Sequence, residues 1–434
     1  MTQSNQQSVS PELVRISQLS ESNEEMVFEQ LMHHFDVDSL RHSYSQLSGK
    51  AAVGSDGISK AQYGESLDNN LSDLVDRLKR MGYRPSPVKE VQIPKEGKRD
   101  VYRPLGLSNF EDKVIQKRFQ ELLEAIYEPV FMDCSYGFRK KRSCHDAIKA
   151  LDSYLYKQEK VVVIDLDLKN YFGSIDHDIL IDLLSQKIAD KRFLRYIQRM
   201  LKGGILSESG FRRSDEGVAQ GSVCSPVLAN VFAHYVLDEW LDTTVREHCR
   251  SELSVYRYAD DVVICCGEEQ DAIRIREALK KRLQKYGLEL NEEKTKLIRW
   301  DKHDLKGSGA FDFLGFTFYL GLSRTGRVIP KLKSSGKKLR VKLSNVNVWC
   351  KRYRNEYRLS VLWSRFCAKL RGHVQYYGVS NNGKSVNRFL RKAIIYFVKW
   401  LNRRSQMRSM TYKQFKDYMC LYPPPKAVTV HRLY

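Results

Sequence analysis

The chain of 434 residues is long enough for two or three domains, and it carries 73 Lys and Arg against 52 Asp and Glu, a formal net charge of +21. Its 42% hydrophobic and 29% charged residues are typical of a globular protein and exclude a disordered chain. No apolar run of about 18 residues is present to span a membrane, the polar start has no signal or transit pattern, and nine scattered cysteines without a C-x-x-C pair indicate a reducing cytoplasm.

The first half of the chain contains both predicted helices and predicted strands. Residues 1–24 are rich in Ser, Gln and Asn, which predicts a flexible polar tail. Apolar residues recur at helical spacing over 111–127, and 161–164 is a β-branched run typical of a buried strand. Residues 177–202 are predicted to form two helices, and 225–246 a further helix that begins at a Ser-Pro pair.

The second half continues this mixture and then becomes strongly basic. Two predicted strands at 255–258 and 262–265 are followed by an amphipathic helix over 270–286 and an aromatic-rich strand region over 311–320. From residue 331 onward, Lys and Arg alternate with aliphatic and aromatic residues at helical spacing. This order predicts an α+β body followed by a basic helical segment.

The positive charge is concentrated in the last quarter of the chain. Residues 321–434 hold 27 Lys and Arg but only two acids, Glu356 and Asp417, a net charge of +25 that leaves −4 for residues 1–320. Such asymmetry indicates a polyanionic partner, which is usually nucleic acid and less often an anionic membrane. The alternative is a solvated basic face that serves solubility, but a charge of this size would repel itself without a partner.

Two pairs of carboxylates stand next to apolar strands. Asp260 and Asp261 separate two apolar runs, and Asp165 and Asp167 follow a third, where their spacing places them on one strand face. An Asp-Asp pair in a hairpin turn can simply face water. Two such clusters could instead converge on a pair of Mg²⁺ ions roughly 4 Å apart, the arrangement used in phosphoryl transfer. Spacing alone leaves open whether Asp165 or Asp167 would be the ligand.

Seven motifs between about residues 95 and 320 resemble, in order, those of the bacterial group II intron reverse transcriptase/maturase family. The matching stretches are RPLGL (103–107), SYGFR with RSCH (135–145), DLKNYF with IDH (167–177), QGS with SPVLAN (220–230), YADD (258–261), GLEL with EKTK (287–296) and FLGF (313–316). The resemblance implies an α+β right-hand polymerase, with fingers, a palm containing an antiparallel sheet, and a basic α-helical thumb or maturase domain.

The resemblance also assigns the metal-binding residues. It implies that Asp167, Asp260 and Asp261, with the backbone carbonyl of Leu168, hold two Mg²⁺ ions, and that Asp165 has a supporting role.

Four residues resemble those that handle the incoming nucleotide. Phe172 is similar to an aromatic gate that clashes with a ribose 2′-hydroxyl, although without the family it could be a core residue. Gln220 resembles the residue that packs against the dNTP, and Lys95 and Arg103 resemble the cations that grip its triphosphate. Outside the family context, either cation could be an ordinary surface residue.

The basic segment resembles the thumb or maturase domain that grips structured intron RNA. The expected domains are a tail (1–24), fingers and palm (25–320), the thumb or maturase domain (321–402) and a short basic segment that could contact DNA (403–434). Most aromatic residues here are expected in the core, with cations on the opposite faces tracking phosphates. The expected nucleic-acid-binding residues are Lys337, Lys338, Arg340, Lys351, Arg352, Arg354, Arg391, Lys392, Arg403 and Arg404.

Three features depart from the family or invite another interpretation. Val218-Ala219 stands where the family usually has Thr-Pro, and the chain reaches Tyr434 without the paired cysteines of an HNH endonuclease, so no endonuclease of its own is expected. Residues 378–385 fit the G-x-x-x-x-G-K-[ST] phosphate-binding pattern. No clear buried strand precedes this stretch, and we expect it to be a loop between two helices.

The sequence therefore predicts an RNA-directed DNA polymerase of a group II intron, which also binds intron RNA to assist splicing and mobility. The implied partners are structured intron RNA, a DNA primer or target and dNTPs, without a membrane, in a bacterial, nucleoid-associated cytoplasmic protein. The alternatives are a splicing-only RNA-binding maturase and a host-adopted relative used in defence or repair. The oligomeric state, the RNA bound and the source of the primer do not follow from the sequence.

Overall fold

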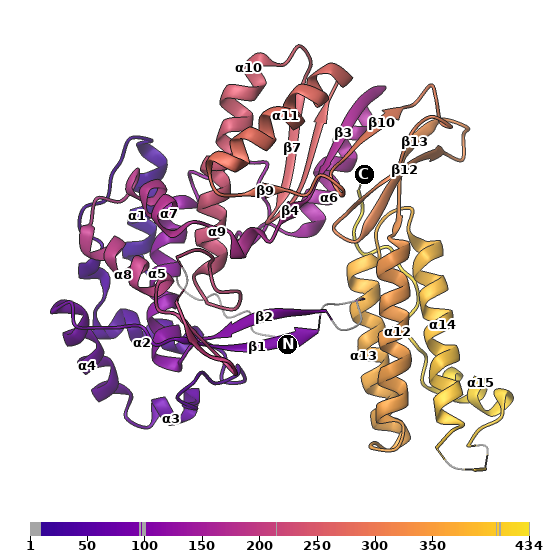
Figure 1. The fold of residues 1–434 in the computed structure, drawn as a ribbon. Helices are drawn as coiled ribbons and strands as arrows, with labels where there is room; N and C mark the ends of the chain where they lie inside the picture. Colours follow the sequence, from indigo (N-terminus) through magenta and orange to yellow (C-terminus); the bar gives the residue numbers. More distant parts are fainter. Residues whose placement is uncertain are drawn as a thin grey trace. The chain divides into compact units, whose positions relative to one another are not determined.

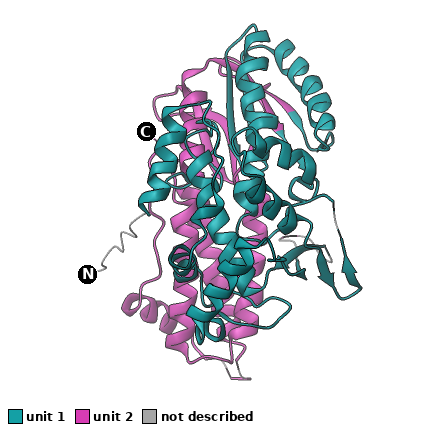
Figure 2. Ribbon diagram, turned by 90° about the vertical axis from the view of Figure 1, so that its left-hand side faces the viewer, with its two compact units in different colours: residues 1–95, 100–143, 166–296 teal, residues 96–99, 144–165, 297–434 magenta. Residues whose placement is uncertain are grey.

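The computed structural model describes residues 10–94, 97, 101–213, 215–404, 406, 407 and 409–433, which form two compact units (Figure 2). Unit 1 comprises residues 1–95, 100–143 and 166–296, and unit 2 comprises 96–99, 144–165 and 297–434. The units are thus interleaved along the chain, and the predicted fingers, palm and thumb boundaries do not coincide with their borders. The chain has the mixed α+β composition that the sequence predicts.

Helices α1, α2, α3 and α9 of unit 1 pack against one long helix, α5 (Figure 1). The apolar positions of α5 that the sequence pattern selected, among them Phe119 and Leu122, are fully buried. The helices of this unit are α1 (Pro11–Ser22), α2 (Val37–Gln46), α3 (Lys60–Gly64), α4 (Leu67–Lys79), α5 (Phe110–Tyr127), α7 (His177–Ser185), α8 (Lys191–Leu201), α9 (Ser225–Ala233), α10 (Arg246–His248) and α11 (Glu269–Lys285). Short 3₁₀ turns occupy Met32–His34 and Tyr171–Gly173.

The prediction of a flexible tail is wrong for Pro11–Ser22, which form helix α1. Leu13 and Ile16 are buried, and the hydroxyl of Ser20 donates to the backbone oxygen of Ile126 at 2.6 Å. The polar composition concealed an apolar stripe that packs on α5, and Pro at the first helical position starts the helix. Tertiary packing, more than local propensity, stabilises such a helix.

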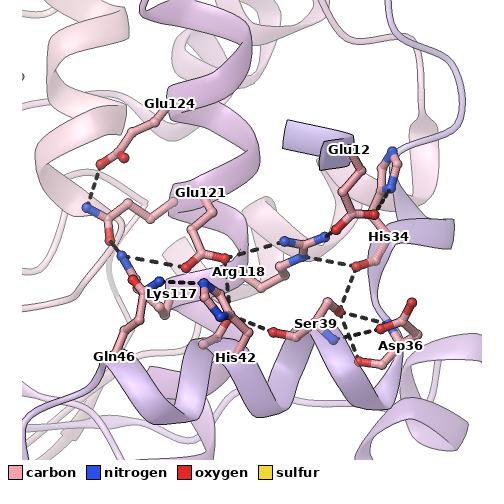
Figure 3. A network of polar contacts seen from close by, with 12 residues as sticks. Glu12, His34, Asp36, Ser39, His42, Gln46, Lys117, Arg118, Glu121 and Glu124 are labelled. Atoms are coloured by element: carbon pink, nitrogen blue, oxygen red, sulfur yellow. Dashed lines mark hydrogen bonds and ion pairs between the residues drawn. The ribbon is translucent and has the colours of Figure 1, made fainter. Parts of the chain in front are cut away.

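A buried polar network joins α1, α2 and α5 (Figure 3). The Arg118 side chain is 1% exposed; it donates to the backbone oxygen of His34 at 3.0 Å and pairs with Glu12 and Glu121. Glu12 also pairs with the imidazole of His34 at 2.9 Å. Because a buried charge is costly unless it is paired and hydrogen-bonded, this network fixes how the three helices meet.

The strands of unit 1 include one complete four-stranded sheet, a hairpin that belongs to the sheet of order β10-β3-β8-β7, and a short two-stranded sheet. The complete sheet has the order β2-β1-β5-β6, with strands β1 (Val88–Pro94), β2 (Tyr102–Leu107), β5 (Ile205–Ser207) and β6 (Gly210–Arg212). The neighbours in this sheet are antiparallel except for β1 and β5, which are parallel. The remaining pairs are the hairpin of β7 (Leu253–Tyr258) with β8 (Asp261–Cys266), and β4 (Leu168–Lys169) with β9 (Glu289–Leu290).

The helix predicted over 225–246 is a continuous helical run with two wider turns. After α9, the segments His234–Asp238 and Leu241–Val245 are π-helical, and α10 ends the run at His248. Such local widening occurs frequently at functional sites. In this chain the first π segment carries the buried Asp238.

Unit 2 combines short strands with a set of long helices (Figure 1). Its aromatic strand region folds into the antiparallel sheet β11-β12-β13, and β10 is the neighbour of β3 in a separate sheet. Its elements are α6 (Cys144–Lys157), β3 (Lys160–Leu166), β10 (Lys296–Asp301), β11 (Phe311–Phe313), β12 (Phe316–Leu322), β13 (Val328–Ser334), α12 (Gly336–Tyr353), α13 (Leu359–Tyr377), α14 (Gly383–Leu401) and α15 (Tyr412–Leu421).

The helical core of unit 2 follows the predicted stripe. Leu362, Phe366 and Leu370 are buried on one face of α13, and the ring of Phe366 packs at a tilt against that of Phe397 of α14, with centroids 4.6 Å apart. Among the described residues, no helix is long and apolar enough to cross a membrane.

The G-x-x-x-x-G-K-[ST] stretch joins α13 to α14, as expected. Its preceding residues, 373–377, are helical, so no strand leads into it. The side-chain oxygen of Asn382 accepts from the backbone N–H of Ser334 at 2.8 Å, and its amide donates to the backbone oxygen of Tyr377 at 2.8 Å. This loop therefore ties two helices to strand β13.

A buried carboxylate in α6 makes the stability of the protein dependent on pH. Asp152 is fully buried, and neither of its oxygens has a hydrogen-bond partner among the described residues. Burial raises the pKa of Asp152 to about 7. In the unfolded chain the same carboxyl ionises near pH 4, so between about pH 4 and pH 7 the folded state binds more protons and stability falls as the pH rises.

Asp152→Asn is expected to remove this loss of stability. At pH 8 the variant gains stability over the wild type by up to roughly 4 kcal/mol, at about 1.36 kcal/mol per pKa unit, whereas at pH 5 the difference shrinks. Urea unfolding at pH 5 and pH 8 measures the change, with Asp182→Asn on the exposed face of α7 as the matched control. Equal stability changes at both pH values would contradict the assignment.

Candidate catalytic site

A cavity of about 770 Å³ in unit 1 collects most of the residues that the sequence singled out. It is lined by the loop after β3, by β2, by the segment before α9 and by the tip of the β7–β8 hairpin. The predicted site residues on its wall are Arg103, Asp167, Leu168, Phe172, Gln220 and Asp260. These six residues are brought together from segments up to 157 positions apart (103 to 260).

Asp167 is held at the cavity by a segment far along the chain. Its carboxylate accepts from the amide of Asn291 at 3.0 Å and pairs with the Lys294 ammonium at 3.2 Å, while its own side chain remains 40% exposed. The Asn291 backbone N–H donates to the Asp167 backbone oxygen at 2.9 Å. Of the two aspartates left open by spacing, Asp167 lines the cavity, and Asp165, also described, does not.

The second aspartate sits on a tight turn. Tyr258 and Asp261 are paired across the β7–β8 hairpin, which leaves Ala259 and Asp260 as a two-residue turn. Ala259 has φ +58°, a left-handed conformation that costs a non-glycine residue roughly 1–2 kcal/mol. Asp260 is exposed toward the cavity, whereas Asp261, within the described part of the chain, is not one of the lining residues.

Phe172 and the segment before Gln220 support each other through the backbone. The Phe172 backbone oxygen accepts from the N–H of Val218 at 2.8 Å, and the Gln220 backbone oxygen accepts from the N–H of Gly106 at 2.7 Å. Gly221 has φ +108°, and a Cβ at this position would lie 2.7 Å from the Gly106 backbone oxygen. The bond to the Phe172 oxygen is made by the backbone N–H of residue 218. Val218 therefore makes it as well as the Thr that the family usually has at this position.

Of the two cations predicted to bind the nucleotide, the structure describes Arg103 but not Lys95. Arg103 is an exposed residue of β2 on the cavity wall, opposite Ile93 in the register of β1. Lys95 lies outside the described residues.

The donor set at the cavity suits Mg²⁺. Mg²⁺ is usually held by one or two carboxylates together with waters and substrate phosphates. Asp167, Leu168 and Asp260 all line the cavity, and the two carboxylates are hard oxygen donors. Among the described residues, no three His, Cys, Asp or Glu side chains are grouped so that they could hold a metal ion by themselves.

The chain matches the family model described as "Reverse transcriptase (RNA-dependent DNA polymerase)" over residues 93–318, more than half of its length. The chain belongs to the reverse transcriptase family. The matched range contains the whole set of cavity residues predicted from the motifs, from Arg103 to Asp260.

The relatives of this chain include a protein named as encoded by a group II intron and another named as an intron maturase, in agreement with the motifs. The chain is 34% identical over 223 residues to "Group II intron-encoded protein LtrA" of Lactococcus lactis subsp. cremoris, covering 51% of this chain and 37% of LtrA. It is 32% identical over 314 residues to "Protein YkfC" of Escherichia coli (strain K12), covering 65% of this chain and 80% of YkfC. It is 27% identical over 173 residues to "Nuclear intron maturase 3, mitochondrial" of Arabidopsis thaliana, covering 38% of this chain and 23% of that protein.

Sequence reasoning missed several residues that line the cavity. Asn291 and Lys294 contact Asp167, and Arg212 and Arg213 add positive charge to the wall. Lys294 stands in the EKTK motif that the family resemblance had marked without a role. Nothing local to Asn291, Arg212 or Arg213 distinguishes them from surface residues, since only packing brings them to the cavity.

The basic surface of unit 2 is a separate candidate interface. Among the described residues, no ion pair involves a Lys or Arg beyond Lys302, so the positive charge there is not neutralised internally. Arg354 and Arg404 are half-buried and donate to backbone oxygens of Lys351 and Tyr357. The other predicted nucleic-acid-binding residues are exposed: Lys337, Lys338, Arg340, Lys351, Arg352, Arg391, Lys392 and Arg403.

Proposed function

We propose that this chain is an RNA-directed DNA polymerase of a group II intron that also binds intron RNA and assists its splicing and mobility. The observation that carries the proposal is the cavity of a reverse transcriptase family member in which Asp167 and Asp260 face the same space as Phe172, Gln220 and Arg103. The match spans 37% of LtrA, so the activity and its substrates rest on this site rather than on the relative's name.

In this proposal Asp167, Asp260 and Asp261 hold two Mg²⁺ ions, with the Leu168 carbonyl as a further oxygen. When bound, the ions would lower the charge repulsion between a primer 3′-hydroxyl and the α-phosphate of a dNTP. Lys294 pairs with Asp167 at 3.2 Å and would compete with a cation for that carboxylate. Positioning by the cavity wall supplies much of the rate.

The substrates follow from the wall of the cavity and from the basic surface. Arg103 and Lys95 would bind the triphosphate, Gln220 would pack against the nucleotide, and Phe172 would exclude the ribose 2′-hydroxyl. The exposed cations of unit 2 would bind the phosphates of structured intron RNA, with the domains acting as fingers, palm and thumb. DNA primer and RNA template are therefore the proposed partners.

Primer extension on an RNA template tests the proposal. Purified full-length chain, a DNA primer annealed to RNA, dNTPs and Mg²⁺ are expected to give extended DNA. A DNA template serves as the comparison. Absence of extension on the RNA template would contradict the proposal, whatever the result on DNA. Splicing of a group II intron RNA at low Mg²⁺, with and without the chain, tests the RNA-binding role separately.

Phe172→Ala is expected to relax sugar selection. Removing the ring opens space beneath the ribose, so incorporation of rNTPs relative to dNTPs rises on the order of 100-fold, about 2.7 kcal/mol of lost discrimination. Single-nucleotide incorporation kinetics with each nucleotide measure the ratio. Phe138→Ala is the matched control because Phe138 packs edge-on against Phe172 at 6.4 Å but does not line the cavity. An unchanged ratio in Phe172→Ala would contradict the gate.

A further inference from the structure

A completely buried arginine stands immediately behind the turn that carries Asp260. The Arg257 side chain is 0% exposed, and its five N–H donors are all used. Nε and Nη2 bind the two oxygens of Asp238 at 2.7 and 2.5 Å. Nη2 also donates to the hydroxyl of Ser135 at 2.6 Å, and Nη1 donates to Asn230 at 3.0 Å and to the backbone oxygen of Ala259 at 3.2 Å.

The contact with Ala259 links this arginine to the backbone of the turn. Ala259 is the left-handed residue of the two-residue turn, and its carbonyl joins it to Asp260. A carbonyl held by a guanidinium fixed at four other points cannot rotate freely. The orientation of the following peptide, and with it the Asp260 side chain, is therefore set from inside the protein.

A second set of contacts holds the same turn from the 135–139 segment. The amide of Asn230 donates to the backbone oxygen of Gly137 at 2.7 Å. A Cβ at Gly137 would lie 2.4 Å from the backbone nitrogen of Ala259, so only glycine permits this close approach. The backbone of Arg257 also bonds to Cys134 and Tyr136 at 2.8 Å each. The turn is thus held by both the guanidinium and a neighbouring backbone.

Packing alone does not account for a buried ion pair at this place. Replacing a buried pair by apolar residues of similar size is often neutral or stabilising, because desolvating two charges is costly. Arg118 in the network of Figure 3 has a similar burial and similar pairing, but it contacts helix α1 and the His34 backbone, which do not line the catalytic cavity. Arg118 can therefore serve as a control for Arg257. The guanidinium of Arg257 contacts the turn of Asp260, whereas that of Arg118 contacts helix α1 and the His34 backbone.

We propose that Arg257, oriented by Asp238, Asn230 and Ser135, is a positioning residue that holds the Ala259–Asp260 turn in the geometry required for divalent-cation binding at the catalytic cavity. The inference rests on the proposed function in that the cation and the reaction are those of the polymerase site. Loosening the turn is expected to weaken cation binding and slow the chemical step, while the proposed contacts of Arg103 and Gln220 with the nucleotide remain.

The test compares three full-length variants with the wild type. Arg257→Lys keeps the positive charge beside Asp238 but loses the donors to Ala259 and Asn230. Ser135→Ala removes a single contact and leaves the ion pair intact. Arg118→Lys weakens a buried ion pair of the same kind away from the cavity. Each variant is measured by thermal unfolding, by Mn²⁺ binding followed by electron paramagnetic resonance, and by primer extension over a range of Mg²⁺ concentrations.

Arg257→Lys is expected to lower kcat by 10- to 100-fold, to change the KM for dNTP by less than about 3-fold, and to raise the Mn²⁺ dissociation constant and the Mg²⁺ midpoint by roughly 5- to 20-fold. Ser135→Ala is expected to shift the same quantities by about 2- to 5-fold. Arg118→Lys is expected to lower the unfolding temperature and to leave the Mn²⁺ affinity and the Mg²⁺ midpoint at wild-type values.

Wild-type Mn²⁺ affinity and Mg²⁺ midpoint in folded Arg257→Lys, or in Ser135→Ala if Arg257→Lys does not fold, would overturn the proposal. The proposal would also be overturned if the activity lost in Arg257→Lys were fully explained by a smaller fraction of folded protein. If the wild type extends no primer, the proposed function fails, and the comparison of Mn²⁺ affinities between wild type and variants still decides the role of Arg257.

Discussion

Asp260→Asn is expected to abolish primer extension, with a loss of at least about 10³-fold in kcat, or roughly 4 kcal/mol. The amide has the shape of the carboxylate but no charge, so it cannot stabilise a divalent cation beside the phosphates of the substrate. Asp260 is exposed on a two-residue turn, and its replacement leaves the buried supports of that turn in place. Folding is therefore expected to be unchanged.

The experiment is sharpest with a matched control and a second aspartate. Asp178→Asn, an exposed residue of α7 that pairs with Lys202, is expected to extend primers at the wild-type rate. Asp261→Asn tests the third proposed ligand, which does not line the cavity, and a loss as large as that of Asp260→Asn would support its assignment. Extension at the wild-type rate by Asp260→Asn would overturn the metal site. Intron splicing that survives Asp260→Asn would show that the RNA-binding role is independent of polymerisation.

Neutralising the exposed cations at the start of α12 is expected to weaken RNA binding on the order of 100-fold at moderate salt. Lys337, Lys338 and Arg340 are exposed, and the described residues of this segment offer them no carboxylate partner in an ion pair. Each phosphate contact contributes about 0.7–0.9 to the slope of log affinity against log salt, so replacing all three by Gln lowers the slope by roughly 2–3. Filter binding or fluorescence anisotropy with structured RNA at several salt concentrations measures both quantities.

A control of equal charge change separates local contact from overall attraction. Lys79, Arg80 and Lys191 are exposed cations of unit 1, and their replacement by Gln lowers the net charge by the same amount. This triple variant is expected to retain the wild-type salt slope. Equal losses in the two triple variants would indicate that only net charge matters and would contradict a binding surface on α12.

The elements with a strong local pattern were predicted correctly, and the weakly patterned ones were not. The apolar runs on both sides of Asp260 became β7 and β8, and 111–127 became α5 within a residue, because hydrophobic periodicity and β-branched runs act locally. The polar N-terminal residues were interpreted as a tail, although Leu13 and Ile16 are buried in α1. Short apolar stripes in a polar context depend on a partner surface that no local rule contains.

The candidate site shows the same division. Two-metal chemistry indicated the aspartate clusters, the family resemblance selected Asp167, Phe172, Gln220 and Asp260, and all four line one cavity. Lys95 falls outside the described residues, so its assignment stays a prediction. The contacts of Asn291 and Lys294 with Asp167 join residues 124 and 127 positions apart and could not be predicted from spacing.

By itself the sequence determined the mixed α+β composition, the basic character of the last quarter and the residue types that a nucleotidyl-transfer site requires. Only the tertiary structure decided that Asn291 and Lys294 contact Asp167 at the cavity, and that the guanidinium of Arg257 uses its five donors behind the turn of Asp260. The physical reason is the distance along the chain over which each effect acts. Propensity, periodicity and charge act between near neighbours in the chain, whereas a cavity wall and a buried ion pair arise when segments far apart exclude water from the same space.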